Sequence, residues 1–503
     1  MALTPSYADF EAGYEAGKNQ LVWTRLAADL DTPVSLMLKL SEAGPLSFLL
    51  ESVTGGEVRG RYSMIGMKPD LIWQCEGATA RLNRQARFDA TAFVDEAADP
   101  LASLRALLAE CHIEMPEGLP PSAAGLFGYL GYDMIRLVEK LPNVNPDPIG
   151  APDAMLLRPS VVAVLDGVKG EVTVVSPAWV SSGLSARAAY AQAAERVMDA
   201  VRDLERQAGE SRSLGELSSV GEPVSNFAHA DYLAAVEKAK DYIRAGDIFQ
   251  VVPSQRWTMD FPLPPFALYR SLRRTNPSPF LFYFNMDGFQ IVGASPEILV
   301  RLREGEVTIR PIAGTRPRGA TPDEDRALEE DLLSDKKELA EHLMLLDLGR
   351  NDVGRVAKIG TVKPTEKFII ERYSHVMHIV SNVIGEIAEG EDALSALLAG
   401  LPAGTVSGAP KVRAMEIIDE LEPEKRGIYG GGAGYFAANG EMDMCIALRT
   451  AVVKDGKLYV QAGGGVVFDS DPQAEWQETV NKSRALMRAA EDAGLFARGR
   501  GNS

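Results

Sequence analysis

Apolar residues recur at helical spacing in two segments of the carboxy-terminal half, and each segment also carries a Glu-x-x-Glu pair. In the first segment, KKELAEHLMLLDLGRND, the spacing of Leu339, Leu343 and Leu346 predicts a helix. Glu338 and Glu341 lie three residues apart, so they become neighbours on its surface. The pattern therefore predicts two carboxylates side by side on one helix face.

The second segment, DPQAEWQETVNKSRALMRAA, also contains a signal for the start of a helix. Asp471 suits the N-cap and Pro472 the first helical position, which places Glu475 and Glu478 near the beginning of the helix and Lys482 one turn later. Taken alone, each acidic pair is more often a solvated helix face than a ligand pair. Four acids converging on one cleft would instead repel one another unless a cation were bound, and Mg²⁺ suits because it takes oxygen ligands.

The rest of the chain mixes amphipathic helices with strands joined by short turns, which is typical of antiparallel sheet. The predicted helices cover residues 187–204 and 231–245, the second one stopped by Gly246. The predicted hairpins join residues 160–165 to 171–175, 298–303 to 307–310, and 445–453 to 458–462.

Length and composition indicate a globular protein with two or more domains, because the chain has 503 residues, of which 46% are hydrophobic and 24% charged. Residues 203–226 are rich in Ser, Gly and Glu and poor in apolar residues, so we predict a linker there. It would separate an amino-terminal region, residues 1–202, from a second domain, residues 227–495, followed by a short tail, residues 496–503.

The formal charge of −18 argues against nucleic acid and anionic membranes as partners. The sequence has no apolar stretch of about 18 residues and no amino-terminal signal pattern, so we expect a cytoplasmic protein. Cys75, Cys111 and Cys445 show no paired spacing, which suggests neither a disulfide framework nor a zinc site.

Gly432-x-Gly434-x-x-Ala437 matches a loose dinucleotide-binding pattern, but a strand and an Asn-Gly turn follow it rather than a helix, so we do not predict NAD binding. Glycines at 430–434 and 463–465 are more consistent with close approach of backbone N–H groups to substrate carboxylates. His378 lies in an apolar, strand-like run, where a buried histidine is most often only hydrogen-bonded. Glu297 follows a strand end, where an exposed turn acid is the simpler interpretation.

Six further motifs lie between and around the acidic pairs. They are PIAGTRPRG at 311–319, SHVMHIVS at 374–381, PAGTVSGAPK at 402–411, YGGGAGY at 429–435, IALRT at 446–450 and AGGGV at 462–466. In this order and spacing, roughly residues 227–490 resemble the chorismate-utilising enzymes. The resemblance implies an α+β fold in which two large antiparallel sheets pack orthogonally and helices flank them.

Within that family the chain is most similar to the large subunits of anthranilate synthases. Aminodeoxychorismate synthases usually carry a nucleophilic lysine where Ala313 stands, and isochorismate and salicylate synthases a lysine base where Gln250 stands. The segments LLES at 49–52, GRYSMIG at 60–66 and NPSPFLF at 276–282 resemble the feedback site for L-tryptophan, although family members often have Tyr-Met where this chain has Phe-Leu. The residues implied for that site are Leu50, Glu51, Ser52, Arg61, Pro279, Phe280 and Leu281.

The resemblance also implies roles for the acidic pairs and the motifs. Glu341 and Glu478 would hold Mg²⁺, with Glu338 and Glu475 supporting through water. The implied catalytic set is Glu297, the acid that protonates the departing C4 hydroxyl, His378, which aids pyruvate elimination, and Glu338. Chorismate would be bound by Gly314, Thr315, Thr405, Tyr429, Arg449, Gly463, Gly464, Gly465 and Lys482.

The expected reaction is amination of chorismate followed by loss of pyruvate to give anthranilate, the first step of tryptophan biosynthesis. No cysteine lies in a Gly-x-Cys-x-Gly elbow, so we expect ammonia to come from a separate glutamine amidotransferase subunit. Two alternatives remain open: an aminodeoxychorismate synthase, disfavoured by Ala313, and a catalytically inactive tryptophan sensor, disfavoured because all the expected site residues are present.

Overall fold

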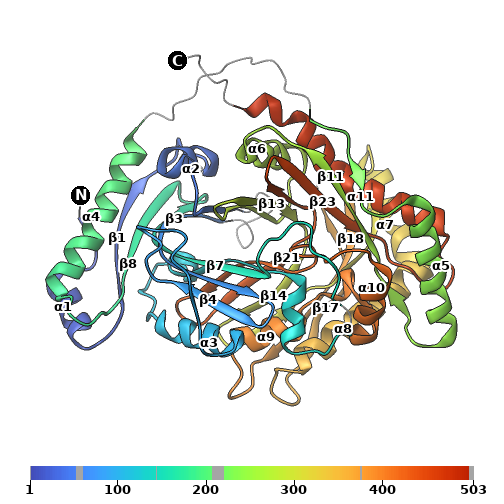
Figure 1. The fold of residues 1–503 in the computed structure, drawn as a ribbon, viewed down its shortest axis with the longest axis horizontal. Helices are drawn as coiled ribbons and strands as arrows, with labels where there is room; N and C mark the ends of the chain where they lie inside the picture. The colour runs from blue at the N-terminus through green and yellow to red at the C-terminus, as the bar shows by residue number, and fades with distance from the viewer. Residues whose placement is uncertain are drawn as a thin grey trace.

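The computed structural model describes residues 2–42, 44–51, 61–142, 144–206, 220–373 and 376–497. Its helices are α1 (Tyr7–Glu15), α2 (Pro33–Ser41), α3 (Pro100–Glu110), α4 (Ala186–Glu205), α5 (His229–Ala245), α6 (Pro265–Thr275), α7 (Pro322–Ser334), α8 (Lys336–Gly354), α9 (Ala393–Gly400), α10 (Lys411–Leu421) and α11 (Pro472–Asp492), with 3₁₀ turns η1 (Pro121–Ala123), η2 (Tyr132–Leu137), η3 (Gly404–Val406) and η4 (Ala493–Phe496). Figure 1 shows their arrangement around a central body of strands.

The strands are β1 (Gln20–Ala27), β2 (Ser47–Glu51), β3 (Tyr62–Glu76), β4 (Thr79–Asn83), β5 (Val94–Asp95), β6 (Gly125–Leu130), β7 (Ala154–Asp166), β8 (Glu171–Ala178), β9 (Val224–Ser225), β10 (Gln250–Val251), β11 (Ser254–Asp260), β12 (Phe280–Asn285), β13 (Phe289–Ser295), β14 (Ile298–Arg303), β15 (Glu306–Ile309), β16 (Ile312–Pro317), β17 (Lys363–Arg372), β18 (Val376–Glu386), β19 (Gly408–Ala409), β20 (Gly432–Ala437), β21 (Met442–Ile446), β22 (Thr450–Lys454) and β23 (Lys457–Gly463).

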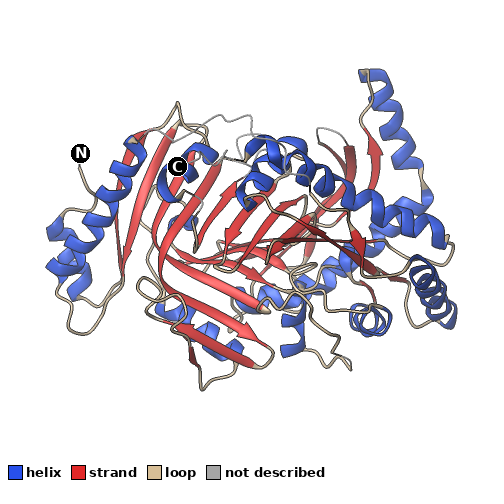
Figure 2. Ribbon diagram, turned by 45° about the horizontal axis from the view of Figure 1, so that its top comes forward, coloured by secondary structure: helices blue, strands red, loops and turns tan. Residues whose placement is uncertain are grey.

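Antiparallel pairing joins 21 of these strands into one hydrogen-bonded network that forms two large sheets. The first runs β1-β8-β7-β3-β2-β12-β13-β22-β23-β11-β9. The second runs β5-β4-β3-β7-β6-β20-β21-β14-β15-β18, with β16 and β17 both pairing with β18. The two long strands β3 and β7 belong to both sheets, so they connect the two layers at a corner (Figure 2).

The sequence explains where β3 and β7 pass from one sheet to the other. Pro69 stands opposite Pro159, and neither can donate a ladder hydrogen bond. Lys68 has a φ of 52°, and the Ser160 hydroxyl donates to its carbonyl at 2.6 Å. The ladder is therefore interrupted at one level in both strands, and the pair bends there.

A second crossing lies in the carboxy-terminal half, and it corrects one prediction. β13 belongs to the first sheet and β14 to the second, and β21 and β22 divide in the same way. The predicted continuous strand 445–453 is therefore wrong: residues 447–449 interrupt it, and Arg449 has a φ of 46°. The chain changes sheets at this point, which the local alternation of apolar residues does not encode.

Three apolar layers hold the fold together. Helices α2, α4, α6 and α11 cover the outer face of the first sheet, and α3, α8 and α9 cover the outer face of the second. Between the sheets, aromatic side chains such as Phe48, Phe127 and Phe284 form a third core, with Phe48 stacked on Phe127 at 4.5 Å between ring centroids. The predicted α+β class, with large antiparallel sheets flanked by helices, is confirmed.

The predicted helices 187–204 and 231–245 correspond to α4 and α5, and Gly246 ends α5 with a φ of 84°. The first two predicted hairpins are β7–β8 and β14–β15. Both predicted regions contribute to the same sheets, through the β2–β12 and β6–β20 pairings. Residues 207–219 of the predicted linker lie outside the described residues, and the domain boundaries stay a prediction.

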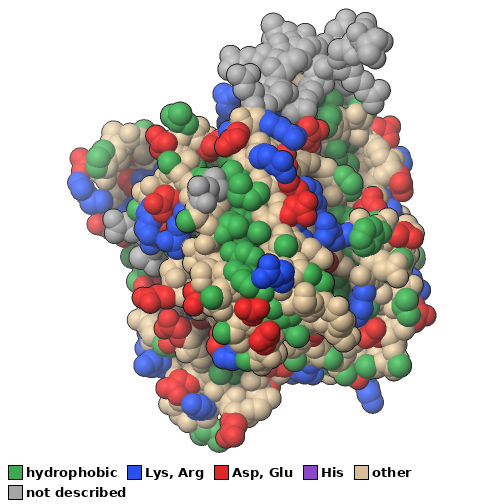
Figure 3. All heavy atoms as spheres, turned by 90° about the vertical axis from the view of Figure 1, so that its left-hand side faces the viewer, with side chains coloured by type: hydrophobic (Ala, Val, Ile, Leu, Met, Phe, Trp, Pro, Cys, Tyr) green, Lys and Arg blue, Asp and Glu red, His purple; other side chains and the backbone are tan. Residues whose placement is uncertain are grey.

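The face covered by α1 and α4 carries acidic and basic side chains among apolar ones (Figure 3). Among the described residues, no helix is both long and apolar enough to cross a membrane.

Candidate active site

The two acidic pairs lie on α8 and α11, as the sequence predicts. Asp335 caps α8 by accepting from the Lys337 N–H at 3.0 Å, and Asp471 caps α11 by accepting from the Ala474 N–H at 2.8 Å. Both caps are local, so each Glu-x-x-Glu pair falls near the start of its helix for reasons contained in the sequence. The positive ends of the two helix dipoles therefore lie close to the carboxylates.

Burial and neighbouring negative charge raise the pKa values of Glu338, Glu341 and Glu475. Burial raises the pKa of Glu338, and the charge of Glu341 adds to it. Burial likewise raises the pKa of Glu341 and of Glu475, and the charge of Glu478 adds to both. Lys482 opposes this effect, since its Nζ lies 2.6 Å from a Glu478 oxygen. The arrangement concentrates negative charge that Lys482, Lys337 and Arg316 offset in part.

Several features of these carboxylates fit a divalent cation. Glu475 Oε2 is buried without a hydrogen-bond partner in the described part of the chain, while Ser470 occupies its other oxygen at 2.6 Å. Among the described residues, no group of three His, Cys, Asp or Glu side chains is close enough to hold a metal by itself. Mg²⁺ usually needs only one or two carboxylates, with water and substrate oxygens completing the octahedron. Two carboxylates, such as those of Glu341 and Glu478, would be enough for such an ion.

Glu297 lies at the second crossing between the sheets, between β13 and β14, and is 6% exposed. Burial raises the pKa of its carboxyl group to about 8, although hydrogen bonds from Thr405 and from the backbone of Ile312 lower it. Thr405 donates at 3.2 Å. Glu297 is thus a buried carboxylic acid that holds its proton at neutral pH, not the exposed turn acid of the simpler interpretation.

His378 lies on β18 and is hydrogen-bonded through Nδ1. That nitrogen lies 2.9 Å from the Gly314 carbonyl and 3.1 Å from the Thr315 hydroxyl. Donation to the carbonyl leaves Nε2 without a proton in the neutral ring. Burial lowers the pKa of His378, and the charge of Arg449 lowers it further, so the neutral ring is favoured. This histidine is suited to accept a proton at Nε2.

Strand β16 connects these groups. Its Ile312 backbone bonds to Glu297, and its Gly314 carbonyl accepts from His378. Gly314 has a φ of 68°, and a Cβ there would lie 3.2 Å from Glu338 Oε2, so a side chain would be strained and would crowd that carboxylate. One short segment therefore brings the acid, the histidine and the first acidic pair to one place.

Arg449 provides the positive charge of the site. No described carboxylate lies within ion-pair distance of its guanidinium group, which is partly buried where β21 passes into β22. Burial lowers the pKa of Arg449, and its charge acts on His378. A partly buried guanidinium without an acidic partner is able to bind an anion, and its planar fork matches a carboxylate.

The predicted glycine segment at 463–465 lies beside the same carboxylates. Lys482 donates to the Gly463 carbonyl at 3.0 Å, and a Cβ on Gly463 would lie 3.0 Å from the Tyr429 hydroxyl. A Cβ on Gly464 would lie 3.2 Å from Glu475 Oε2. The glycine segment, Tyr429 and the second acidic pair are therefore neighbours in the fold.

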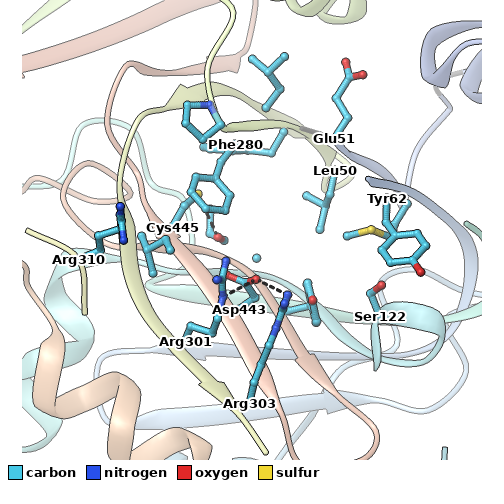
Figure 4. A pocket seen from close by; sticks show the side chains of 18 of the residues that line it. Leu50, Glu51, Tyr62, Ser122, Phe280, Arg301, Arg303, Arg310, Asp443 and Cys445 are labelled. Carbon is cyan, nitrogen blue, oxygen red and sulfur yellow. Dashed lines mark hydrogen bonds and ion pairs between the residues drawn. The ribbon is translucent and has the colours of Figure 1, made fainter. Parts of the chain in front are cut away.

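The described residues predicted for the inhibitor line a cavity of about 830 Å³ between the two sheets, whose wall also includes Ile312 and Tyr373 beside the candidate active site. Figure 4 shows Leu50 and the Phe280 ring pointing into it. Glu51 instead reaches the other face of its strand, where Tyr269 and Arg273 donate to it, and Leu281 packs in the core on that same face. Ser52 lies outside the described residues.

Known proteins resemble this chain over most of its length. A family model described as chorismate binding enzyme matches residues 66–488. The chain belongs to the chorismate-binding enzyme family.

Several relatives within the family narrow the resemblance to anthranilate synthases. Anthranilate synthase component 1 of Cereibacter sphaeroides is 80% identical over 99% of this chain and 99% of its own length, and the Pseudomonas aeruginosa protein of the same name is 52% identical over 92% and 93%. The crystal structure of anthranilate synthase component I from Streptococcus pneumoniae is 36% identical, with a TM-score of 0.75, and covers 92% of this chain and 99% of that one. The predicted resemblance to anthranilate synthase large subunits is confirmed.

A more distant solved structure shares the fold alone. The menaquinone-specific isochorismate synthase of Escherichia coli is 19% identical, with a TM-score of 0.70, over 94% of this chain and 95% of its own. The two-sheet architecture of the family therefore persists where most of the sequence has changed.

Two residues near the site had no role assigned from the sequence. Gln250 donates to Glu341 at 3.3 Å, and its own Oε1 is buried without a partner in the described part of the chain. Tyr373 places its ring edge-on to His378, with 5.5 Å between the centroids. Gln250 could have been found as the residue where relatives carry lysine, whereas no sequence signal pointed to Tyr373.

Proposed function

We propose that this chain is the chorismate-binding subunit of an anthranilate synthase, which aminates chorismate with ammonia in a Mg²⁺-dependent reaction and then eliminates pyruvate. Anthranilate synthase activity itself follows from the comparisons, since a relative of that name is 80% identical over nearly the whole chain and another is 52% identical. The finer statements about metal, ammonia source and inhibition are inferences from the site.

The observation that supports the chemistry best is the meeting of a protonated acid, a neutral histidine and an unpaired guanidinium at the second sheet crossing. Chorismate has two carboxylates, a leaving hydroxyl and an enolpyruvyl ether. Arg449 would bind the enolpyruvyl carboxylate bidentately. Mg²⁺, held by Glu341 and Glu478 with Glu338 and Glu475 supporting through water, would supply positive charge for the ring carboxylate.

The first half-reaction needs an acid. Ammonia adds at C2 of chorismate while the C4 hydroxyl leaves, and Glu297 gives that hydroxyl its proton so that it departs as water. The raised pKa of Glu297 keeps the proton available at neutral pH. Thr405, by its hydrogen bond at 3.2 Å, stabilises the carboxylate that remains.

The second half-reaction needs a base. His378 accepts a proton from the aminated ring at Nε2, the C–O bond to the enolpyruvyl group breaks, and that group takes up a proton and leaves as pyruvate. The ring becomes aromatic, which gives anthranilate. Gly314 fixes the tautomer required, because its carbonyl accepts from Nδ1.

Ammonia would come from a glutamine amidotransferase subunit. Cys75, Cys111 and Cys445 are all buried, and burial raises the pKa of each thiol, so none is an activated nucleophile for glutamine. We place this reaction in the cytoplasm and propose L-tryptophan as the inhibitor that occupies the inter-sheet cavity.

One assay tests these statements together. The purified chain is given chorismate, Mg²⁺ and ammonium at mildly alkaline pH, and anthranilate fluorescence is followed with and without L-tryptophan. We expect fluorescence that requires Mg²⁺, falls with tryptophan and is absent when glutamine replaces ammonium.

Chorismate consumed without anthranilate would instead indicate an aminodeoxychorismate or isochorismate product. No consumption at all would favour the tryptophan sensor. Anthranilate made from glutamine by the chain alone would contradict the need for a partner subunit.

A further inference from the structure

Glu422 and Arg426 form a buried ion pair next to the candidate active site, and neither residue belongs to the predicted site. Arg426 follows α10 and is 3% exposed, and Glu422 is 4% exposed. The guanidinium Nε donates to Glu422 Oε2 at 2.9 Å, and Nη2 donates to Glu422 Oε1 at 2.5 Å. The pair is therefore bidentate and closed to solvent.

Arg426 directs its other donors to two segments that carry site residues. Its Nη1 donates to the Val406 carbonyl at 2.6 Å, and its Nη2 donates to the Val252 carbonyl at 2.6 Å. Val406 directly follows Thr405, and Val252 lies two residues after Gln250, which donates to Glu341. Arg426 thus connects the loop of Thr405, which bonds to Glu297, with the segment of Gln250, which bonds to the proposed metal ligand Glu341.

Glu422 extends the connection to a third segment. Its Oε1 accepts from the Ser254 N–H at 2.7 Å and from the Ser254 hydroxyl at 2.8 Å. Ser254 is paired with Gly463 across β11 and β23, and the neighbouring Pro253 carbonyl accepts from Gly464 at 3.1 Å. The position of the glycine segment therefore depends on Glu422.

The rings of Tyr132 and Tyr429 also contact the Arg426 guanidinium. The Arg426 guanidinium lies 5.5 Å from the ring centroid of Tyr429 and 4.9 Å from that of Tyr132. Tyr429 is one of the residues predicted to line chorismate. The guanidinium thus fixes the ring of Tyr429 by a cation–π contact as well as the backbone on two sides of it.

Stability alone is a weak explanation for this pair. Removing two charges from water is expensive, and apolar replacements of buried ion pairs are often neutral or stabilising. Here the donors go to backbone carbonyls of separate loops, and a lysine has neither the planar fork nor the number of donors to reach all of them. An arginine at 426 is therefore explained by the groups it holds in place, which are the Val252 and Val406 carbonyls and the ring of Tyr429.

We propose that Glu422 and Arg426 are positioning residues that set the relative placement of Thr405, Tyr429 and the glycine segment 463–465. This inference rests on the proposed function. Its direct consequence is on turnover of chorismate, since Glu297 is oriented through Thr405. The metal carboxylates are positioned mainly by helices α8 and α11, and Gln250 adds only one hydrogen bond of 3.3 Å to Glu341. The concentration of Mg²⁺ needed for half-maximal activity should therefore change little.

The test compares Arg426→Lys with Arg136→Lys in the ammonia-dependent reaction. Arg136 is a matched control, because it is also largely buried and pairs with Asp133 and Asp419, yet contacts none of the three site segments. We expect Arg426→Lys to lower kcat/KM for chorismate by about 10- to 100-fold, the effect of a small misplacement of reacting groups. Arg136→Lys should lower Tm without a comparable kinetic change.

Glu422→Gln is the second variant, and it should lower kcat/KM in the same direction because Ser254 and Arg426 lose a charged partner. If either variant folds and its kcat/KM for chorismate falls no more than that of Arg136→Lys, the inference is wrong. A large increase in the Mg²⁺ requirement without a fall in kcat would also overturn it.

The unaltered chain is assayed first, so that a failure of the proposed function can be distinguished from a failure of the positioning inference. An unaltered chain that makes no anthranilate contradicts the proposed function. An active unaltered chain with unaffected positioning variants contradicts this inference alone.

Discussion

Thr405 donates a hydrogen bond to Glu297 at 3.2 Å across 108 residues of sequence. The bond lowers the pKa of Glu297 while burial raises it, and burial dominates, so the pKa lies at about 8. The same contact orients the carboxyl group and prepares it for the charge that remains after proton transfer. Both the rate of the reaction and its dependence on pH should therefore respond to changes at this pair.

Replacing Glu297 with glutamine removes the proton donor but keeps the shape of the side chain. We expect Glu297→Gln to lower kcat by about 10²- to 10⁴-fold, the usual contribution of general acid catalysis. Its Tm at pH 7 should equal or exceed that of the unaltered chain, because the cost of keeping a buried carboxyl protonated above its unfolded pKa disappears. A folded Glu297→Gln enzyme with normal kcat would exclude Glu297 as the acid.

The pH dependence of kcat/KM should report the same group. The active form is the protonated one, so kcat/KM at a fixed concentration of free NH₃ should be level below the pKa of Glu297, about 8, and fall as pH rises through it. In Thr405→Val the alkaline limb should move to higher pH, because the bond that lowers the pKa is lost. A limb that stays in place in this variant would assign it to another group.

Glu478 tests the metal site. We expect Glu478→Gln to raise the Mg²⁺ concentration required for half-maximal activity by about tenfold or more, since loss of a carboxylate ligand weakens binding of a hard cation. Glu491→Gln is the matched control, because Glu491 is an exposed carboxylate on the same helix. Folded Glu478→Gln with an unchanged Mg²⁺ requirement would show that the metal assignment is wrong.

Arg449 tests substrate recognition. Lysine keeps the charge but makes no bidentate contact with a carboxylate, so Arg449→Lys should raise KM for chorismate by about tenfold or more. The pKa of His378 should change little, because the positive charge that lowers it is retained. Steady-state kinetics over a chorismate series, repeated across pH, give both values, and an unchanged KM would place the enolpyruvyl carboxylate elsewhere.

A change in the inter-sheet cavity should weaken inhibition by tryptophan without removing catalytic activity. Phe280→Ala removes a ring that points into the cavity (Figure 4) and should raise the tryptophan concentration for half-inhibition by about tenfold, with ammonia-dependent turnover retained. Phe88→Ala, a change of an 89% exposed ring, serves as the control.

Reciprocity gives a further check on the inhibitor. Chorismate and tryptophan should weaken each other's binding by the same factor at equilibrium. Equal tryptophan inhibition of the unaltered chain and of Phe280→Ala would place the inhibitor outside this cavity.

Local sequence determined the helices and their caps. Asp335 and Asp471 begin α8 and α11 by bonds that span two or three residues, so the two acidic pairs could be placed on their helices from the sequence alone. The hairpins at β7–β8 and β14–β15 were predictable for the same reason, since alternation and turn residues are close in sequence. The resemblance to a family supplied the assignment of roles, which spacing alone left open.

Contacts between distant residues were decided by the tertiary structure. The break at Arg449 depends on a change of sheet, and strand alternation carries no record of it. Glu51 and Leu50 are neighbours in sequence, yet only the packing of α6 shows that the Glu51 carboxylate bonds to Tyr269 and Arg273 while Leu50 joins the core between the sheets. Arg426 and Glu422 are only four residues apart, but the backbone carbonyls of Val252 and Val406 that Arg426 also contacts come from distant segments.

The sequence by itself therefore determined the helices α4, α5, α8 and α11, two hairpins, the acidic pairs and the family, because these depend on residues within a few turns or on motifs in a fixed order. The tertiary structure alone decided that Glu297 is buried and protonated, that Arg449 has no acidic partner in the described chain, and that Glu422 and Arg426 join the loops of the site. Burial and charge pairing depend on which segments fold together, and local spacing does not specify that.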